Sequence, residues 1–357
     1  MQDDELDDLR ALIGPLLQSL EALGFIARHF NPADFAEVMQ AAGEPDTALR
    51  AARPRLDAWP EALAGVRERL SSASDTALAA FDDLRAAPDE PDGLRAVFRA
   101  LRHLPRAQEA LYPLAAGLPP VSRFFLDPAS RDNAGLQASL ADAPERDGVG
   151  VMHFGGEPSA RGAWSMYVPE YYSDDRAWPL VFALHGGSGN GRSFLWSWLR
   201  DARAHGAIVV APTAIGDTWA LSGPDLDTPN LAGMLDEVRG RWRIDPERML
   251  LGGMSDGGTF SYVSGLEPAS PFTHLAPTSA AFHPMLAAMA DPARLQGLPI
   301  HLTHGALDWM FPVSMAREAR DALSAAGARV TYRELDDLSH TFPRELNPSV
   351  LAWLAAG

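Results

Sequence analysis

Ser255 lies in the stretch of this chain whose residue types most clearly suggest chemistry. It occupies the centre of Gly253-Met254-Ser255-Asp256-Gly257, directly after the apolar residues 249–251, and residues 259–265 can continue as a helix. A serine between a buried strand and a helix is typical of a nucleophile elbow, a tight turn that projects the hydroxyl. Glycines suit such a turn because a β-carbon would clash with neighbouring backbone and because strained dihedrals cost least at glycine. The pattern predicts an activated serine, although alone it also fits an ordinary glycine-rich turn.

His340 is the candidate base for this serine. A serine hydroxyl needs a neighbouring group that accepts its proton, and histidine most often does so. His340 follows the strand expected at 329–335 and lies in a loop before the last expected helix. A lone loop histidine is usually solvated, but this position, downstream of Ser255 and after the final strand, favours the catalytic interpretation.

Asp308 is the candidate acid that orients the base. It directly follows the strand expected at 299–303, and the chain order Ser255, Asp308, His340 is the order expected for an α/β-hydrolase. Three other aspartates are poorer choices, because one points away from the turn and two lie too close to the histidine along the chain: Asp256, Asp336 and Asp337.

Backbone donors for a developing oxyanion are expected from a glycine-rich loop. The strand at 179–184 is followed by His185-Gly186-Gly187-Ser188-Gly189. Glycines let backbone N–H groups approach a small anionic oxygen, so we assign the N–H groups of Gly187 and Asp256 as the oxyanion hole. Such a loop is also compatible with an ordinary turn, whereas a phosphate cradle is disfavoured because no Gly-Lys-Ser/Thr follows.

Alternating strands and helices over residues 148–357 predict the scaffold for these groups. Helical stretches separate many of the apolar runs, and one of them, 227–242, begins at Asp227-Thr228-Pro229. This alternation predicts an α/β fold with a mostly parallel, eight-stranded sheet covered by helices on both faces. The expected strands are 148–154, 163–169, 179–184, 207–211, 249–253, 275–279, 299–303 and 329–335.

Residues 1–120 have a different texture. Apolar residues recur at helical spacing, as in Leu6, Leu9 and Ile13, so this region predicts an all-helical N-terminal domain. Residues 121–147 are expected to be a linker, loop-like from 126, and 148–357 the catalytic domain. The helical domain could act as a lid over the site or as a surface for self-association; the sequence does not decide between them.

Composition limits the partners of this chain. Of 357 residues, 46% are hydrophobic and 22% charged, and no apolar run approaches the roughly 20 residues that span a bilayer. The net charge of −17 disfavours nucleic acids and anionic lipid surfaces as partners. The chain has no cysteine, which excludes disulfides and thiolate sites, and its acidic first residues do not resemble an export signal. We expect a soluble cytoplasmic protein without a membrane span.

The combined motifs resemble the α/β-hydrolase superfamily. They comprise residues 179–191, 253–258, 304–312 and 339–343. Within the superfamily, Tyr167-Val168-Pro169-Glu170-Tyr171-Tyr172 ahead of the strand at 179–184 resembles the phospholipase/carboxylesterase group and the polyhydroxybutyrate-depolymerase-like and feruloyl-type esterases. The resemblance covers about residues 148–357 and implies Ser255 as nucleophile, Asp308 as acid and His340 as base, with Gly187 and Asp256 at the oxyanion hole. No family counterpart is identified for the N-terminal 120 residues.

Other residues near the expected site carry weaker predictions. Trp219, Trp309 and Phe311 lie in loops after strands, where they could line the substrate pocket or equally cover apolar core. His301 and His304 are three residues apart, which on a strand places them on opposite faces, and no third ligand is evident, so neither a metal nor another cofactor is expected.

The sequence therefore predicts a serine hydrolase that cleaves a small carboxylic ester through an acyl-enzyme. The same groups would also serve a thioesterase or a peptidase. A non-catalytic binding protein on a hydrolase fold is the alternative from another functional class.

Overall fold

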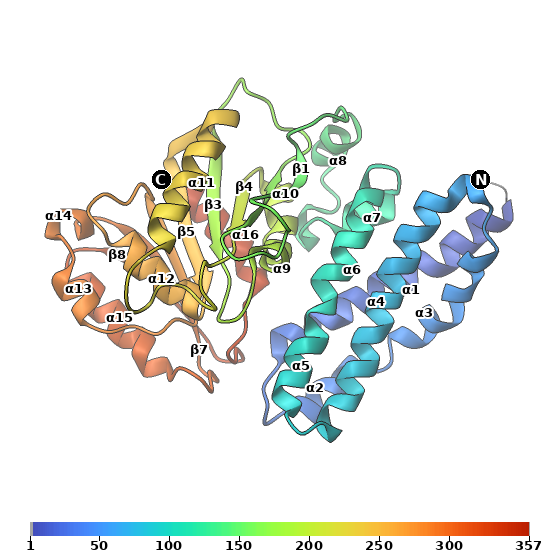
Figure 1. The fold of residues 1–357 in the computed structure, drawn as a ribbon, viewed down its shortest axis with the longest axis horizontal. Helices are drawn as coiled ribbons and strands as arrows, with labels where there is room; N and C mark the ends of the chain where they lie inside the picture. Colours follow the sequence, from blue (N-terminus) through green and yellow to red (C-terminus); the bar gives the residue numbers. More distant parts are fainter. Residues whose placement is uncertain (1–2, 357) are drawn as a thin grey trace. The chain divides into compact units, whose positions relative to one another are not determined.

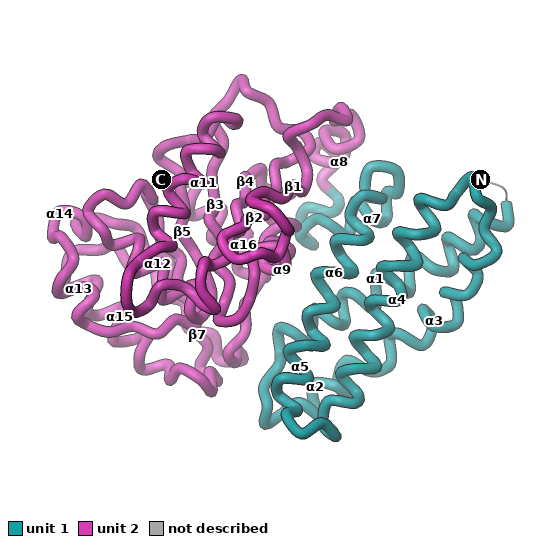
Figure 2. Tube along the Cα trace, viewed as in Figure 1, with its two compact units in different colours: residues 1–132 teal, residues 133–357 magenta. Residues whose placement is uncertain are grey.

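The computed structural model describes residues 3–356, and the chain divides into two compact units. Unit 1 comprises residues 1–132 and unit 2 comprises residues 133–357 (Figure 2). Over residues 3–132 the regular elements of unit 1 are all helices, whereas unit 2 contains the sheet (Figure 1). The segment 126–147, for which the sequence suggested loop structure, contains the short helices η5 (Pro128–Ser130) and α8 (Ala134–Ala141). The Asn133 side chain caps α8 by accepting a hydrogen bond from the Leu136 N–H.

Unit 1 buries one face of each of its longer helices. In α1, Leu12, Leu16, Leu20 and Leu23 are fully buried or nearly so, and their spacing of three or four residues forms one stripe that faces α3 and α4. Burial of each leucine stabilises the fold by about 1.5–3 kcal/mol. The helices are α1 (Asp3–His29), α2 (Phe35–Ala42), α3 (Asp46–Ala52), η1 (Arg53–Ala58), η2 (Glu61–Leu63), α4 (Ala64–Ala86), η3 (Ala87–Asp89), α5 (Gly93–Leu101), α6 (His103–Leu111), η4 (Tyr112–Ala116) and α7 (Pro119–Phe124).

Helix α1 is long and apolar enough, by length and composition alone, to cross a membrane. An 18-residue window within it has a mean hydropathy of 1.3, and 44% of that window is buried within the structure. The sequence analysis did not register this window, because scattered polar residues break it into short apolar runs. A core helix of a helical bundle passes the same test, and the buried leucine stripe of α1 fits that role.

Unit 2 is built on one eight-stranded sheet in the order β1-β2-β4-β3-β5-β6-β7-β8. Strands β4, β3, β5, β6, β7 and β8 are parallel, whereas β1 and β2 pair antiparallel at one edge. All eight strands expected from the apolar runs are present, which confirms the predicted fold class. Their bounds are β1 (Gly150–Phe154), β2 (Trp164–Val168), β3 (Trp178–Leu184), β4 (Ile208–Pro212), β5 (Ile244–Met254), β6 (His274–Thr278), β7 (Pro299–Gly305) and β8 (Arg329–Leu335).

Helices cover the sheet of unit 2. In Figure 1, α11 and α12 lie in front of the strands and α16 lies behind them. The helices not yet given bounds are α9 (Gly191–Phe194), η6 (Leu195–Ser197), α10 (Leu199–His205), α11 (Asp227–Arg241), α12 (Asp256–Gly265), α13 (Met285–Met289), α14 (Pro292–Leu295), α15 (Val313–Ala325), η7 (Arg344–Leu346) and α16 (Asn347–Ala356). Strand β3 is buried along nearly its whole length, as expected of a strand with helices on both faces.

The strand order places a binding edge beside β3. Strand β3 pairs with β4 on one side and with β5 on the other, so the chain changes direction across the sheet at this point. In open α/β sheets, ligands bind outside the carboxyl ends of the strands where the order reverses. The loops that follow β3 and β5 therefore lie at the expected binding edge.

Candidate active site

Ser255 occupies a strained turn between β5 and α12. Strand β5 ends at Met254 and α12 begins at Asp256, so a single residue joins the two elements. Ser255 has φ 55° and ψ −121°, a backbone conformation that residues other than glycine rarely adopt. Such backbone strain costs about 1–3 kcal/mol and persists only where the surroundings enforce it. The geometry is that of a nucleophile elbow.

The flanking glycines make this turn possible. A β-carbon at Gly257 would lie 2.4 Å from the Leu184 carbonyl oxygen and 2.5 Å from the His185 carbonyl oxygen. A β-carbon at Gly253 would lie 2.6 Å from the Gly257 carbonyl carbon. These distances are far below contact distance and involve backbone atoms, so α12 and the end of β3 approach the elbow only because both residues lack side chains. The prediction that glycines are needed for close backbone approach is confirmed here.

A continuous chain of hydrogen bonds joins Ser255, His340 and Asp308. The His340 Nε2 atom lies 3.0 Å from the Ser255 Oγ atom, and the His340 Nδ1 atom lies 2.9 Å from the Asp308 Oδ2 atom. The three side chains are 9% exposed or less. With the proton on Nδ1 held by the carboxylate, Nε2 is free to accept the serine proton. The structure thus brings together the three side chains predicted from widely separated positions.

Close packing of two loops brings His340 to Asp308. Asp308 follows β7 and His340 follows β8, which is the parallel neighbour of β7. The Leu307 N–H donates to the Leu338 carbonyl oxygen at 3.0 Å. A β-carbon on Gly305 would lie only 2.1 Å from that same Leu338 oxygen, so glycine is required where the loops meet.

Asp308 is held in its ionised form. Its Oδ1 atom accepts hydrogen bonds from the Met310 N–H at 2.9 Å and the Phe311 N–H at 2.8 Å. Burial alone would raise the pKa of this carboxyl, but the hydrogen bonds from His340 and Phe311 outweigh it and lower the pKa below its ordinary value. Asp308 therefore presents a fixed negative charge to the His340 ring.

The glycine-rich loop after β3 lies against the elbow. A β-carbon on Gly186 would be 3.6 Å from the Ser255 Cβ atom, and one on Gly187 would be 2.8 Å from the Asp256 Oδ2 atom. Within residues 3–356, the N–H groups of Gly187 and Asp256 donate to no other protein group. The two donors assigned from sequence therefore lie on adjoining segments beside Ser255, and both are free to bind an oxygen atom.

Comparison with known proteins gives the site a family context. Residues 230–355 match the family model described as Phospholipase/Carboxylesterase. This segment contains Ser255, Asp308 and His340. Over these residues unit 2 is similar to the phospholipase/carboxylesterase family, and its fold is that of an α/β-hydrolase.

The curated relative that matches is distant. It is a "Probable feruloyl esterase C" from Aspergillus clavatus, 26% identical over 169 residues, which are 45% of this chain. The chain spans 57% of the length of that relative.

Solved structures that resemble the chain are also esterases and serine hydrolases by description. A thermostable esterase is 21% identical with a TM-score of 0.44, covering 58% of this chain and 59% of its own. A ferulic acid esterase is 17% identical with a TM-score of 0.47, covering 54% and 92%. A fluorophosphonate-binding serine hydrolase F of Staphylococcus aureus is 14% identical with a TM-score of 0.46, covering 57% and 96%.

In unit 2, His185 supports the glycine-rich loop that follows β3. Its Nε2 atom accepts a hydrogen bond from the Ala214 N–H at 3.1 Å, so the proton lies on Nδ1, 2.6 Å from the Gly186 carbonyl oxygen. Burial lowers the pKa of His185 to about 4, with the Gly186 bond opposing it. The ring is therefore neutral at pH 7 and supports the loop.

The three aromatic residues predicted near the pocket divide into two groups. Trp219 is 2% exposed, donates its indole N–H to the His185 carbonyl oxygen at 2.8 Å and stacks on Phe260. It serves as core. The rings of Trp309 and Phe311 lie 6.1 Å and 5.3 Å from the His340 ring, and Trp309 is 38% exposed. These two residues are at the site.

Sequence reasoning missed two side chains that contact the predicted groups. Thr218 donates its hydroxyl to the Asp256 Oδ2 atom at 2.5 Å, which ties the loop after β4 to the elbow. His304 lies 3.4 Å from the Asp308 Oδ2 atom and is fully buried. The four-residue spacing between His304 and Asp308 was a signal, but the analysis weighed His304 only as half of a metal pair.

Among the described residues, no group of three side chains suited to a metal ion is present. His301 and His304 turn to different partners. The His301 ring lies 5.5 Å from the Trp353 ring, and burial lowers its pKa. His304 instead contacts Asp308, so these two histidines do not converge.

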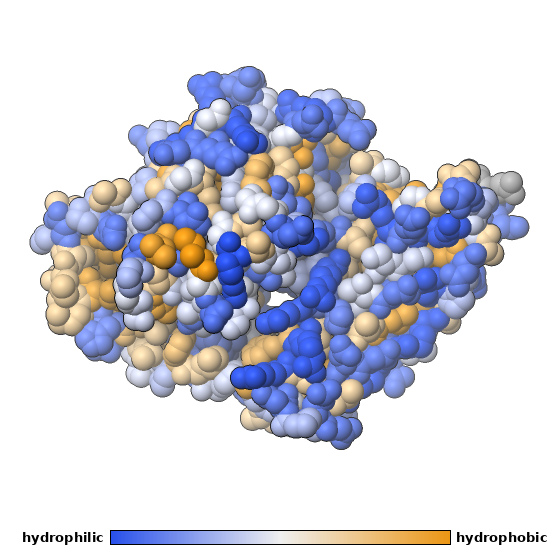
Figure 3. Space-filling model, viewed as in Figure 1, coloured by the Kyte–Doolittle hydropathy of each residue, from blue (hydrophilic) through white to orange (hydrophobic). Residues whose placement is uncertain are grey.

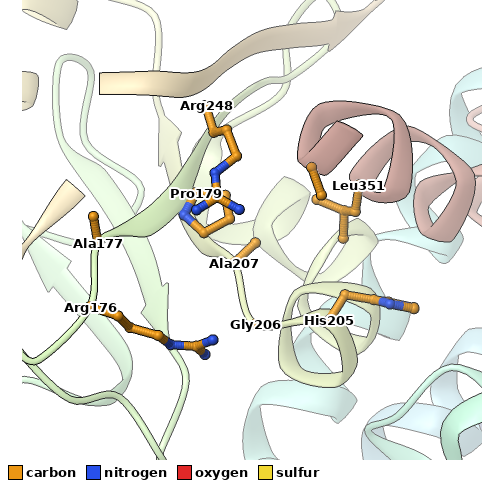
Figure 4. A pocket seen from close by; sticks show the side chains of 9 residues that line it. Arg176, Ala177, Pro179, His205, Gly206, Ala207, Arg248 and Leu351 are labelled. Atoms are coloured by element: carbon orange, nitrogen blue, oxygen red, sulfur yellow. The ribbon is translucent and has the colours of Figure 1, made fainter. Parts of the chain in front are cut away.

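A cavity of about 280 Å³ is lined by residues that include Pro179, Ala207 and Leu351 (Figure 4). It opens where β3 and β4 begin, because Pro179 and Ala207 line it, together with Leu351 of α16. Two cationic side chains, Arg176 and Arg248, also line it. Ser255, Asp308 and His340 lie at the carboxyl ends of the strands, so this cavity is at the opposite end of the sheet and is separate from the candidate active site.

Proposed function

We propose that unit 2 hydrolyses carboxylic esters through an acyl-enzyme on Ser255. One observation carries the proposal: the Ser255 Oγ atom, on a strained elbow, lies 3.0 Å from a histidine nitrogen whose other nitrogen binds a buried carboxylate. The contact supplies the base that a serine hydroxyl needs at neutral pH. The family match over residues 230–355 supports the same reaction class.

The mechanism follows from the positions of these groups. The Ser255 oxygen attacks the ester carbonyl carbon while His340 Nε2 accepts the hydroxyl proton. The N–H groups of Gly187 and Asp256 bind the tetrahedral oxygen, and His340 then protonates the departing alcohol. Water then attacks the acyl-enzyme while His340 Nε2 accepts a proton from it. His340 returns this proton to the Ser255 oxygen, which releases the acid and restores the hydroxyl. Asp308 keeps the imidazole in the required tautomer throughout.

Exposed apolar side chains beside the triad favour an ester with an apolar group. Leu307, Trp309 and Met310 flank Asp308 and are 38–49% exposed. The loop after β4, which Thr218 ties to Asp256, carries Leu221 and further exposed apolar residues. Figure 3 shows a group of strongly hydrophobic residues on the surface of unit 2. Exposed apolar residues that gather beside reactive groups often mark a ligand-binding region.

Turnover of a substrate panel tests the proposal. The panel comprises p-nitrophenyl esters of short and medium acids, a methyl ester of ferulic acid, an acyl thioester and a peptide amide. The ferulic ester is included because of the description of the distant relative. We expect ester hydrolysis to exceed thioester and amide hydrolysis. Faster amide or thioester turnover would assign the triad to a peptidase or a thioesterase instead.

Two serine variants complete this test. Ser255→Ala removes the nucleophile and is expected to abolish turnover. Ser261→Ala is the matched control, because Ser261 is buried in α12, the helix that follows Ser255, and within residues 3–356 its hydroxyl donates only to the Gly258 carbonyl oxygen. Full turnover by Ser255→Ala would mean that the activity belongs to another site and that unit 2 is a binding protein on a hydrolase fold.

A further inference from the structure

His304 lies in the active site without touching the reacting atoms. Its ring is fully buried at the end of β7, and its Nε2 atom lies 2.9 Å from the Phe311 carbonyl oxygen. The same Nε2 atom lies 3.4 Å from Asp308 Oδ2, the oxygen that binds His340. One imidazole nitrogen therefore faces two acceptors, and both belong to the loop of residues 308–311 that follows β7.

The hydrogen-bond partners of His304 assign its proton. Nε2 faces only acceptors, so it must carry the proton. The Nδ1 atom is buried and has no hydrogen-bond partner within residues 3–356. A second proton on Nδ1 would be a buried donor without a hydrogen-bond partner, which is unfavourable. The neutral Nε2–H tautomer is the form that fits this site.

His304 closes a ring of contacts around the base. It donates to the Phe311 carbonyl oxygen, the Phe311 N–H donates to Asp308 Oδ1, and Asp308 Oδ2 accepts from His340 Nδ1. The Phe311 ring also packs edge-to-face on the His340 ring at 5.3 Å. Removing His304 would release both the carboxylate and the aromatic ring that fix the orientation of His340.

We propose that His304 is a positioning residue for catalysis: its Nε2–H clamps the 308–311 loop so that Asp308 holds His340 in line with Ser255. The proposal rests on the proposed esterase function. It assigns His304 no proton transfer and no contact with substrate. A displacement of the base by about 1 Å can lower the rate roughly 100-fold. We therefore expect loss of the His304 hydrogen bond to lower kcat and to leave KM unchanged.

Two substitutions of His304 test the position of the hydrogen-bond donor, since both replace the ring with an amide. The Gln amide nitrogen reaches about as far as histidine Nε2, whereas the Asn amide nitrogen reaches only about as far as Nδ1. We expect His304→Asn to lower kcat roughly 10- to 100-fold with KM within about twofold of wild type, and His304→Gln to recover most of that loss. His301→Gln is the matched control, because it changes another buried histidine of β7 that faces away from Asp308.

The readouts distinguish positioning from simple loss of folding. Rates are normalised to folded protein by thermal unfolding and near-UV circular dichroism. The downfield proton resonance of His340 Nδ1–H reports its bond to Asp308 whether or not an ester is turned over. We expect this resonance to shift or broaden in His304→Asn and to persist in His304→Gln and His301→Gln.

Three outcomes would overturn the proposal. The first is a kcat for folded His304→Asn within about twofold of wild type, and the second is an equal loss in His304→Gln or His301→Gln. The third is an unchanged His340 resonance in His304→Asn. Failure of the esterase function itself is distinguishable, because wild-type protein would then turn over no ester while the His340 resonance still responded to the His304 substitutions.

Discussion

Asp46 in unit 1 and Asp308 in unit 2 are both buried carboxylates, but their partners differ in kind. Asp46 is 2% exposed and accepts hydrogen bonds from Arg85 at 2.6 and 2.9 Å and from Arg50 at 3.1 Å. Asp308 accepts from backbone N–H groups and from His340. In both, burial raises the pKa, and hydrogen bonds outweigh it so that the pKa falls below its ordinary value.

The difference shows what separates a structural charge from a catalytic one. Arginine does not lose its proton in proteins, so Arg50 and Arg85 cannot accept a proton from a reacting group, and their contacts with Asp46 only hold helices α3 and α4 together. The imidazole of His340 can gain and lose a proton, and its far nitrogen reaches the Ser255 hydroxyl. Burial and a lowered pKa are therefore common to both sites, and the partner decides the role.

The largest expected effect separates the two carboxylates by activity. Asp308→Asn would favour the wrong tautomer of His340 and is expected to lower kcat roughly 10⁴-fold. Asp46→Asn should leave kcat per active site within about twofold of wild type, since unit 1 supplies no group to the triad. Steady-state kinetics on an ester, with active-site titration, measures both. A comparable loss of kcat per active site in Asp46→Asn would remove the distinction.

The second expected effect concerns the free energy of unfolding, to which the buried Asp46 contributes. Asp46→Asn leaves two arginines without their shared anion and should destabilise unit 1 by about 2–3 kcal/mol. This is less than for a fully buried pair because Arg50 and Arg85 are 47% and 39% exposed, so water screens them. Urea unfolding followed by circular dichroism measures the change. Asp82→Asn is the control, because Asp82 also binds Arg50 but is 57% exposed, and a loss as large as that of Asp46→Asn would contradict the account.

The smallest effect is a pH dependence of the same stability. Because the folded pKa of Asp46 lies below the unfolded value of about 3.8, its contribution is fully present above that pH. It is lost as the pH falls through the folded pKa. Unfolding free energies measured between pH 5 and pH 2.5 should therefore fall less steeply for Asp46→Asn than for wild type, by at most about 1.4 kcal/mol per pH unit. Identical slopes would mean that Asp46 is not stabilised as an anion.

Much of unit 2 was accessible from sequence because its signals are local. Apolar runs bounded by turn residues predicted each strand, and the order of Ser255, Asp308 and His340 predicted the triad. The strained φ of Ser255 and the clash sites at Gly257 were expected from the glycine pattern alone. Helix α8 was overlooked although Asn133 is a suitable N-cap residue, because the surrounding segment is polar.

What the sequence did not reveal depends on how loops pack. The burial of Trp219 follows from the contact of the loop after β4 with the His185 backbone, and no local pattern encodes that contact. The role of His304 depends on the Phe311 carbonyl turning back towards β7. The longer extent of β5 arises from the pairing of Ile244 with Trp178, which only the register shows.

Labelling with a fluorophosphonate tests the central claim most directly, because the probe reacts with a serine hydroxyl only when a neighbouring base activates it. Intact-mass measurement followed by peptide mapping should show one adduct on Ser255 of the wild-type protein and none on folded Ser255→Ala. Folded wild-type protein that stays unlabelled, or that carries the adduct on another serine, would contradict the account.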